Sequence, residues 1–435
     1  MPTQRPSYLK ILSNRSFFSL WFGQLISVTG DAVFDVALLW LVLTTTGSVF
    51  LVGITQAIIY LPGVVVSPFA GVYVDRLNRR SIMLLSNVVQ GIIVATISFL
   101  YVVNSLSFEV LLVLVFALYS TSRFFLAAMR AVIPRMVEDR THLVAANSLF
   151  TLTSSFSQFA SYAFGGVVIL FLGVALPLTY DSFTFFFAAI MLLFVARHHG
   201  EISRRTNPTL PSDPSTPNSD DKNDGLKRGR AKGSFRADFA EGLRYFFSSK
   251  LMTELVVLGI TANFFLGGSL ALLAPYAKFW IHGDASTYGF ILGAFSFGIF
   301  AGAYFVGKLR NLGEYVGTFL FFGVIANGII IALIGLATTQ FVSIGLFFVL
   351  GVLLSFVNVP LQALYQVKIP QEIFGRVYTV IVALLSVAQP VSAVISGDVA
   401  SIFSIGEVFT TYGVLSVCAS VVAYVAFKEL RTTKY

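Results

Sequence analysis

Twelve long apolar segments are the feature of this sequence that most limits what it can fold into. A bilayer core of about 30 Å needs roughly 20 apolar residues in a helix, and each segment is about that long or longer. The mean hydropathy of +0.82 over 435 residues is far above that of a soluble protein. The sequence therefore predicts an all-α integral membrane protein with twelve transmembrane helices. The segments lie near 17–44, 50–73, 82–103, 108–131, 143–173, 177–196, 251–281, 285–307, 315–337, 340–363, 376–402 and 407–427.

The distribution of basic residues predicts the orientation of the chain in the membrane. With a cytoplasmic N-terminus, nearly all Lys and Arg fall on the inner side, and the outer side keeps only Lys278. Short loops rich in Lys and Arg stay in the cytoplasm, so we expect both termini there, in the inner or plasma membrane. The net charge of +8 then reflects topology and predicts no nucleic-acid partner.

A polar segment divides the spans six and six. We expect a six-helix bundle over residues 1–196, a cytoplasmic linker over 197–250 and a second six-helix bundle over 251–435. The middle of the linker is rich in Pro, Ser and Asp, which predicts a flexible chain. Over 235–249, Phe and Leu recur at helical spacing with basic residues between them. This stretch is interpreted either as a helix on the inner membrane surface or as the run-in to span seven.

The two halves resemble each other at a constant offset of 231 residues. Gly71 lies over Gly302 and Arg79 over Arg310, and in spans five and eleven Gln158 lies over Gln389. Two six-span halves of like orientation indicate a parallel repeat, in which the substrate site lies between the halves near the membrane midplane.

The sequence lacks the residues needed for a disulfide, an intramembrane metal site or a nucleotide-binding loop. The single cysteine, Cys418, and four histidines outside the spans offer neither a disulfide nor an intramembrane metal site. GAYFVGKL at 302–309 nearly matches a phosphate-binding loop, but Leu309 replaces the hydroxyl that holds magnesium. We therefore predict that the chain is not an enzyme and uses no cofactor. Its energy would come from an ion gradient, with protons the first candidate, or from the substrate's own gradient.

Two carboxylates interrupt the first apolar span, in the stretch GDAVFDVALLWLV at 30–42. Each costs about 2.5–3.5 kcal/mol at a helix centre. The Leu, Ile, Val and Phe of this span offset that cost with little to spare. Asp31 and Asp35 are one turn, or about 6 Å, apart on the same face, so both can point into the protein.

The loop sequence GVYVDRLNRRSIML at 71–84 resembles the signature loop between spans two and three of the major facilitator superfamily. Asn78 stands where the family usually has Gly, and we expect the turn to survive because Asn best tolerates a left-handed backbone. The resemblance implies a cytoplasmic latch in which Asp75 meets the start of span eleven near Gly375 and Arg376. The alternative is a positive-inside loop with an incidental Asp. The matching residues are Gly71, Asp75, Arg76, Arg79 and Arg80.

Four further stretches are similar to the drug, macrolide and siderophore exporters of this superfamily: SVTGDAVFDVA in span one, and those at 130–149, 238–255 and 374–380. In the antiporter pattern of span five, a Gly-Pro pair precedes a pair of glycines. Gly165 and Gly166 match the paired glycines, whereas Ser161 and Tyr162 replace the Gly-Pro pair. The resemblance implies a monomeric secondary transporter that works by alternating access, exporting a hydrophobic or amphipathic small molecule in exchange for protons. The alternatives are a proton-coupled importer of a polar nutrient and a non-transporting membrane sensor.

The family's central cavity is lined by spans one, four, seven and ten, so the resemblance brings Arg123 of span four within reach of Asp31. Burial and an Arg neighbour act oppositely on the charge of Asp31, which suits proton-coupled exchange. The alternative is a permanent ion pair that holds the two helices together. Two hypotheses remain for Asp35. It either carries a proton or contacts a substrate cation, or it is only part of a solvated cavity wall.

Other polar residues complete the predicted site. Asn263 in span seven falls within one position of Asp31 when the halves are superposed. Gln158 and Gln389 either line the path or bond neighbouring helices. Asp181 and Asp398 fall near the outer ends of spans six and eleven, where we expect water and a structural role. The expected partners are a small-molecule substrate and membrane lipid.

Overall fold

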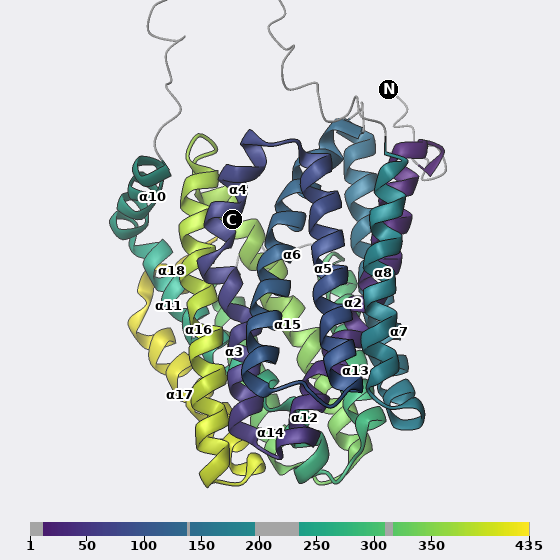
Figure 1. Ribbon diagram of the computed structural model, residues 1–435. Coiled ribbons are helices and arrows are strands. Elements are labelled where there is room, and N and C mark those ends of the chain that lie inside the picture. Colours follow the sequence, from purple (N-terminus) through teal and green to yellow (C-terminus); the bar gives the residue numbers. More distant parts are fainter. Residues whose placement is uncertain (1–11, 137–139, 196–234, 309–315, 435) are drawn as a thin grey trace, which may run out of the picture.

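The structure is a computed structural model that describes residues 12–136, 140–195, 235–308 and 316–434. Its long helices run between two ends of the molecule, and α3 lies beside α16 and α7 beside α13 (Figure 1). Those of the N-terminal half are α2 (Arg15–Thr46), α3 (Val49–Val65), α4 (Ser67–Arg76), α5 (Arg79–Val102), α6 (Phe108–Met136), α7 (Arg140–Leu172) and α8 (Ala175–Leu193).

The C-terminal half has the same plan, preceded by a helix from the linker. Its elements are α10 (Phe235–Ser248), α11 (Lys250–Ala271), α12 (Leu273–Pro275), the π-helix η3 (Tyr276–Trp280), α13 (Ala285–Val306), α14 (Val316–Leu336), α15 (Gln340–Lys368), α16 (Phe374–Ile402), α17 (Ile405–Ala426) and α18 (Lys428–Thr432).

The predicted spans are confirmed in the described part of the chain, with a break in the second. Eleven helices are long and apolar enough to cross a membrane, and α3 is a shorter apolar helix. The second predicted span is α3 followed by α4, divided at Val66. Pro68 explains the break, because it lacks an N–H and its ring clashes with the carbonyl four residues earlier.

The two ends of the bundle differ in what they carry. We call the end where α8 finishes and α10 begins the linker end, which lies at the top of Figure 1, and the other end the loop end. Tight turns close the loop end, two of them at glycines with a left-handed backbone: Gly47 (φ 66°) and Gly173 (φ 76°). These short turns hold α2 to α3 and α7 to α8 near the loop end.

The halves touch through two pairs of glycines near the loop end. A Cβ on Gly53 of α3 would stand 3.0 Å from the Cα of Gly397 in α16. A Cβ on Gly289 of α13 would stand 2.9 Å from the Cα of Gly166 in α7. Because neither pair has side chains, the backbones meet directly. The α3–α16 and α7–α13 contacts are equivalent under the internal repeat, and they form what we call the glycine seams.

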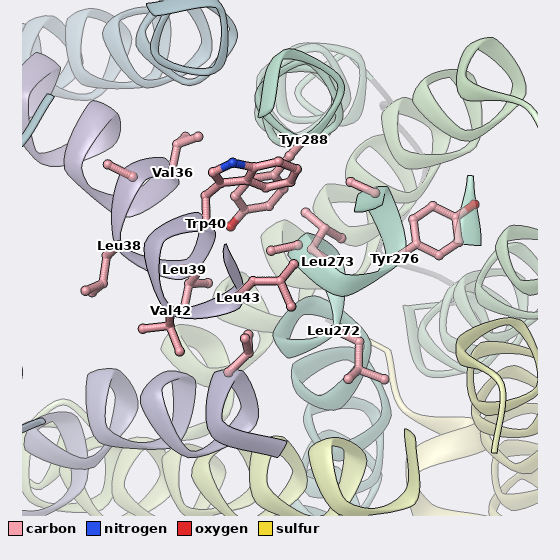
Figure 2. Packing of buried hydrophobic residues seen from close by; sticks show 14 of the residues in the cluster. Val36, Leu38, Leu39, Trp40, Val42, Leu43, Leu272, Leu273, Tyr276 and Tyr288 are labelled. Carbon is pink, nitrogen blue, oxygen red and sulfur yellow. The ribbon is translucent and has the colours of Figure 1, made fainter. Parts of the chain in front are cut away.

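A shared hydrophobic core reinforces the seams at the loop end. Trp40 of α2 stacks on Tyr288 of α13, with ring centroids 6.2 Å apart, and Leu43 lies beside Leu273 of α12 (Figure 2). At the linker end the buried residues form separate clusters, one around Phe17 in the N-terminal half and one around Phe321 in the C-terminal half. The largest buried cluster shared by the two halves therefore lies toward the loop end.

The linker helix α10 packs on the C-terminal half. A Cβ on Gly242 would stand 2.7 Å from the carbonyl oxygen of Arg376, so α10 lies directly against the start of α16. Glu241 forms an ion pair with Arg376, and Phe246 is buried. The stretch is thus a helix attached to the C-terminal bundle, and its position on a membrane surface stays a prediction.

Candidate functional site

The carboxylate of Asp35 is held by two tyrosines from different helices. Tyr119 of α6 donates a hydrogen bond of 2.5 Å to Oδ1, and Tyr162 of α7 donates one of 3.4 Å to Oδ2. Tyr60 of α3 and Tyr288 of α13 lie within electrostatic range of the same carboxyl group. Asp35, taken as unpaired in the sequence, therefore sits in a ring of phenols drawn from both halves.

A third carboxyl group lies next to Asp31 and Asp35. Asp181 of α8 is fully buried and within electrostatic range of both. Its Oδ1 accepts a hydrogen bond of 3.3 Å from Thr184, and its Oδ2 has no partner in the described part of the chain. The expectation that water reaches Asp181 is wrong, because α8 packs this face against α2. Asp398 of α16 is exposed, as expected.

Gly30 makes the approach of α8 possible. A Cβ on this residue would stand 2.2 Å from Oγ1 of Thr184 and 2.5 Å from Oδ1 of Asp181. Only a residue without a side chain leaves room for these polar atoms against α2. Asp31 follows Gly30 directly in the chain and is half-buried, so the three carboxyl groups form one cluster. We call Asp31, Asp35 and Asp181 the carboxyl cluster.

The carboxyl cluster lies close to the loop-end contacts. Tyr162, which donates to Asp35, has its own carbonyl oxygen 2.5 Å from where a Cβ on Gly289 would stand. Trp40, five residues beyond Asp35 on α2, stacks on Tyr288. The Nζ of Lys278 lies 5.8 Å from the Trp40 ring centroid. The site and the closed end therefore share helices and neighbouring side chains.

Arg123 does not pair with Asp31. No ion pair joins these two described residues, and the Nε of Arg123 has no hydrogen-bond partner in the described part of the chain. The guanidinium instead lies against α3, 3.7 Å from where a Cβ on Gly63 would stand. The hypothesis of a permanent ion pair is wrong for this conformation. Tyr119, one turn before Arg123 on α6, takes the place beside α2.

Two basic residues of the signature loop, Arg79 and Arg80, bind backbone carbonyls of helices in their own half. Arg80 donates to the carbonyls of Leu192 and Leu193, at 3.0 and 2.8 Å, where α8 ends. Arg79 donates to the carbonyl of Ala131 in α6, at 3.5 Å. A cation at a helix C-terminus also opposes the helix dipole favourably. These contacts hold the linker-end turn between α4 and α5 in place.

Asn78 does not adopt the left-handed backbone that the sequence predicted for this turn. Its backbone is extended (φ −69°, ψ 113°), and its side chain caps α5 by accepting from the N–H groups of Arg80 and Ser81. The turn survives through N-capping, which Asn favours, and a left-handed backbone is not needed. A Cβ on Gly71 would meet nothing within 4 Å. The side chains of Asp75 and Arg76 lie outside the described structure, so the latch stays a prediction.

The remaining predicted polar residues are scattered. Asn263 of α11 donates a hydrogen bond of 3.4 Å to the carbonyl of Leu385 and lines a small recess in the C-terminal half. Gln389 of α16 packs against Gly267 of α11, and Gln158 of α7 is exposed. None of the three belongs to the carboxyl cluster. Among the described residues, no group of His, Cys, Asp and Glu is arranged to hold a metal ion.

Comparison with known proteins identifies the family. The sequence model of the Major Facilitator Superfamily matches residues 20–393. This chain belongs to the Major Facilitator Superfamily. It is therefore a multi-pass membrane transport protein with a small-molecule substrate, and the expected twelve-helix major facilitator fold is confirmed.

Relatives of this facilitator include named exporters. Macrolide efflux protein A of Streptococcus pyogenes is 21% identical over 408 residues, which cover 93% of this chain and 94% of the relative. The putative bacilysin exporter BacE of Bacillus subtilis (strain 168) is 31% identical over 185 residues, covering 40% of this chain and 44% of the relative. These relatives agree with the resemblance to the exporter branch.

A solved structure shows the same fold. A bacterial homologue of the human lysosomal transporter Spinster, in an inward-facing and occupied conformation, matches with a TM-score of 0.68 and 12% identity, covering 95% of each chain. At this identity the likeness extends to the fold alone.

Three residues of the site were missed in the sequence: Tyr119, Tyr162 and Asp181. Tyr119 lies one turn from Arg123 on the same helix. Its position beside that predicted site residue could have indicated that it also belongs to the site. Tyr162 stands at the Pro position of the antiporter pattern, and the structure places its hydroxyl on Asp35. For Asp181 the usable signal was a glycine, Gly30, adjacent to an intramembrane carboxylate.

Proposed function

We propose that this facilitator exports a hydrophobic or amphipathic small molecule in exchange for protons, by alternating access. The observation that carries the proposal is Asp35, bonded by two tyrosine hydroxyls, with Asp31 one turn away. None of the cluster's carboxyl groups has a basic partner in the described part of the chain. A carboxyl group in such a setting can take up a proton or bind a substrate cation, and doing one excludes the other.

Tyr162 supplies a route from proton binding to movement. As a carboxylate, Asp35 accepts a hydrogen bond on each oxygen, whereas a carboxylic acid uses one oxygen as a donor. Protonation therefore forces at least one tyrosine to rearrange. Tyr162 lies on the face of α7 that meets Gly289 across the seam. Loss of its bond to Asp35 loosens α7 from α2 beside the seam, and this lets α7 shift where it meets α13.

The proposed direction of transport and the proposed substrate class rest on the named relatives and on the distribution of Lys and Arg along the chain. The relatives are named for macrolide efflux and bacilysin export, and the aromatic surroundings of Asp35 suit amphipathic or cationic compounds. The Lys and Arg distribution supports a cytoplasmic position for the linker end. The proposal takes the transporter to be a monomer in the lipid of the plasma membrane. The structure, joined at the loop end, then represents the state in which substrate enters from the cytoplasm.

The test uses inverted membrane vesicles that contain the protein and a radiolabelled macrolide. An inside-acid pH gradient should drive accumulation of the macrolide in the lumen. Asp35→Asn should abolish the accumulation, because it removes the titrating group. Asp398→Asn should retain it, because this variant makes the same chemical change at an exposed carboxyl group.

Two results would contradict the proposal. Macrolide uptake that persists after a protonophore and in the Asp31→Asn, Asp35→Asn double variant would refute proton coupling. Gradient-driven accumulation in right-side-out vesicles alone would show import instead of export.

A further inference from the structure

A small polar recess lies inside the C-terminal half, on helices that do not carry the carboxyl cluster. Its volume is about 80 Å³, and its walls come from α11, α14 and α15, with single residues of α16 and α17. Most of the lining is Leu, Val and Ile. The carboxamides of Asn263, Asn327 and Asn358 converge on it from three different helices. Apart from Ser416 of α17, the rest of the wall is apolar or glycine, so the three carboxamides are its main polar feature.

The carboxamide oxygens are largely unused. Asn327 donates through Nδ2 to the carbonyl of Gly323, at 2.9 Å, while its buried Oδ1 has no partner in the described structure. Asn263 likewise uses its Nδ2, on the carbonyl of Leu385. Asn358 makes no hydrogen bond with any described residue. A buried acceptor without a donor is unfavourable, so the Oδ1 of Asn327 is available to a donor that enters the recess.

The recess is accessible at one side. Asn358 is the one exposed residue of its lining, whereas Leu255, Leu320 and Val324 at the other side are buried. Asn358 therefore marks the mouth. A space of this size holds a few water molecules or the terminal group of a larger molecule.

We propose that this recess binds a hydroxyl-bearing end of the transported molecule. The inference rests on the proposed export of an amphipathic compound. It adds the chemical group at the end of that compound that does not contact Asp35. The free acceptor of Asn327 calls for a donor, and no charged side chain lines the recess, which favours a neutral hydroxyl over an ammonium group. The apolar walls fit the carbons that carry the hydroxyl. A basic end at Asp35 and a hydroxyl at Asn327 would let one molecule contact both halves.

The experiment compares matched ligands on the purified full-length protein. Straight-chain alkylamines from hexylamine to dodecylamine are titrated by calorimetry, each beside its terminally hydroxylated derivative. A hydroxyl makes the chain less apolar, so a purely apolar site prefers the parent amine at every length. We expect the reverse at one chain length, where the hydroxylated amine binds about tenfold more tightly.

Variants assign the preference to the recess. Asn327→Leu and, independently, Asn358→Leu should remove it. Asn358→Leu lies at the exposed mouth and keeps the test informative if the buried change prevents folding. Asn87→Leu, which alters a buried carboxamide of the N-terminal half, should leave the preference intact.

The outcomes separate this inference from the proposed function. A parent amine that binds as tightly as its derivative at every length would overturn the inference, and so would a preference that survives both Asn327→Leu and Asn358→Leu. In the first case the recess holds only water. Neither result bears on proton coupling, which is measured as flux through Asp35→Asn.

Discussion

Asp181 touches α2 at Gly30, with its Oδ1 2.5 Å from the position that a Cβ on that glycine would occupy. The contact buries a carboxyl group completely and leaves its Oδ2 without a partner in the described structure. An arrangement this unfavourable for stability is typical of functional residues within membranes. Gly30 is therefore as much a part of the site as the acidic residues.

Gly30→Ala should destabilise the protein by about 1–3 kcal/mol, because the new methyl group overlaps Thr184 and Asp181 and must push α8 from α2. A thermal unfolding experiment in detergent measures the effect as a lower Tm. Gly71→Ala is the matched control, since a Cβ there meets nothing within 4 Å. Equal Tm values for the two variants would show that α8 does not pack on α2 as described.

Tyr119→Phe should slow proton-driven efflux roughly ten- to hundredfold, because it removes a hydrogen bond to the Asp35 carboxylate. Tyr162→Phe should have a smaller effect, since its bond is longer. Vesicle uptake of a radiolabelled macrolide measures both rates. Tyr60→Phe, near Asp35 but with no hydrogen bond to it in the described structure, should transport nearly normally. A ranking with Tyr60→Phe slowest would contradict this account.

Gly289→Val should open the loop end. Its Cβ would stand 2.5 Å from the carbonyl oxygen of Tyr162, so α13 and α7 must separate. Because the halves are held at this end, we expect the opposite conformation to become more populated. Gly345→Val makes the same change where a Cβ has nothing within 4 Å, and it should have no such effect.

Spin labels measure that opening directly. Labels at Thr46 and His282, both exposed at the loop end of different halves, are introduced after Cys418→Ala removes the native thiol. Double electron–electron resonance should show a longer distance in Gly289→Val than in the parent. An unchanged distance distribution would mean that this seam does not hold the loop end closed.

The N-cap of α13 predicts a pH dependence of stability. Partial burial acts to raise the pKa of Asp284, but hydrogen bonds from Ser286 and Thr287 outweigh it and hold the pKa below its usual value. The stabilisation is therefore complete above the unfolded pKa of about 4 and is lost as the pH falls through the lower folded value. Asp284→Ala should lower the Tm at neutral pH by an amount that shrinks in acid.

The control for that measurement is another N-cap. Ser249 caps α11 through a hydroxyl that does not titrate, so the loss of Tm in Ser249→Ala should be independent of pH. A loss in Asp284→Ala that stays constant down to about pH 3 would show that the carboxylate is not the stabilising form.

The spans and the paired face of Asp31 and Asp35 could be predicted from the sequence because each follows from one local rule. Bilayer thickness sets the length of an apolar helix, and the helical repeat puts residues four apart on one face. Pro68 was visible as well, although the break that it makes between α3 and α4 was not expected.

The partners of those carboxyl groups could not be predicted in the same way. Tyr119 and Arg123 lie one turn apart on α6, and both could reach α2. Only the rotation of α6 in the packed bundle decides that Tyr119 meets Asp35 while Arg123 lies against Gly63. Likewise the burial of Asp181 depends on how closely α8 approaches Gly30, a property of two helices together.

The glycine seams bear on the speed of the transport cycle. At Gly53–Gly397 and Gly166–Gly289 the halves meet as backbone on backbone, with no side chain between them. When the two halves rotate relative to each other during transport, the backbones at these glycine pairs can move past each other without a change of side-chain rotamer at the contact. The seams should then add little side-chain reorganisation to the activation barrier, which leaves the shared core around Trp40 and Tyr288 and the bonds at Asp35 to set its height.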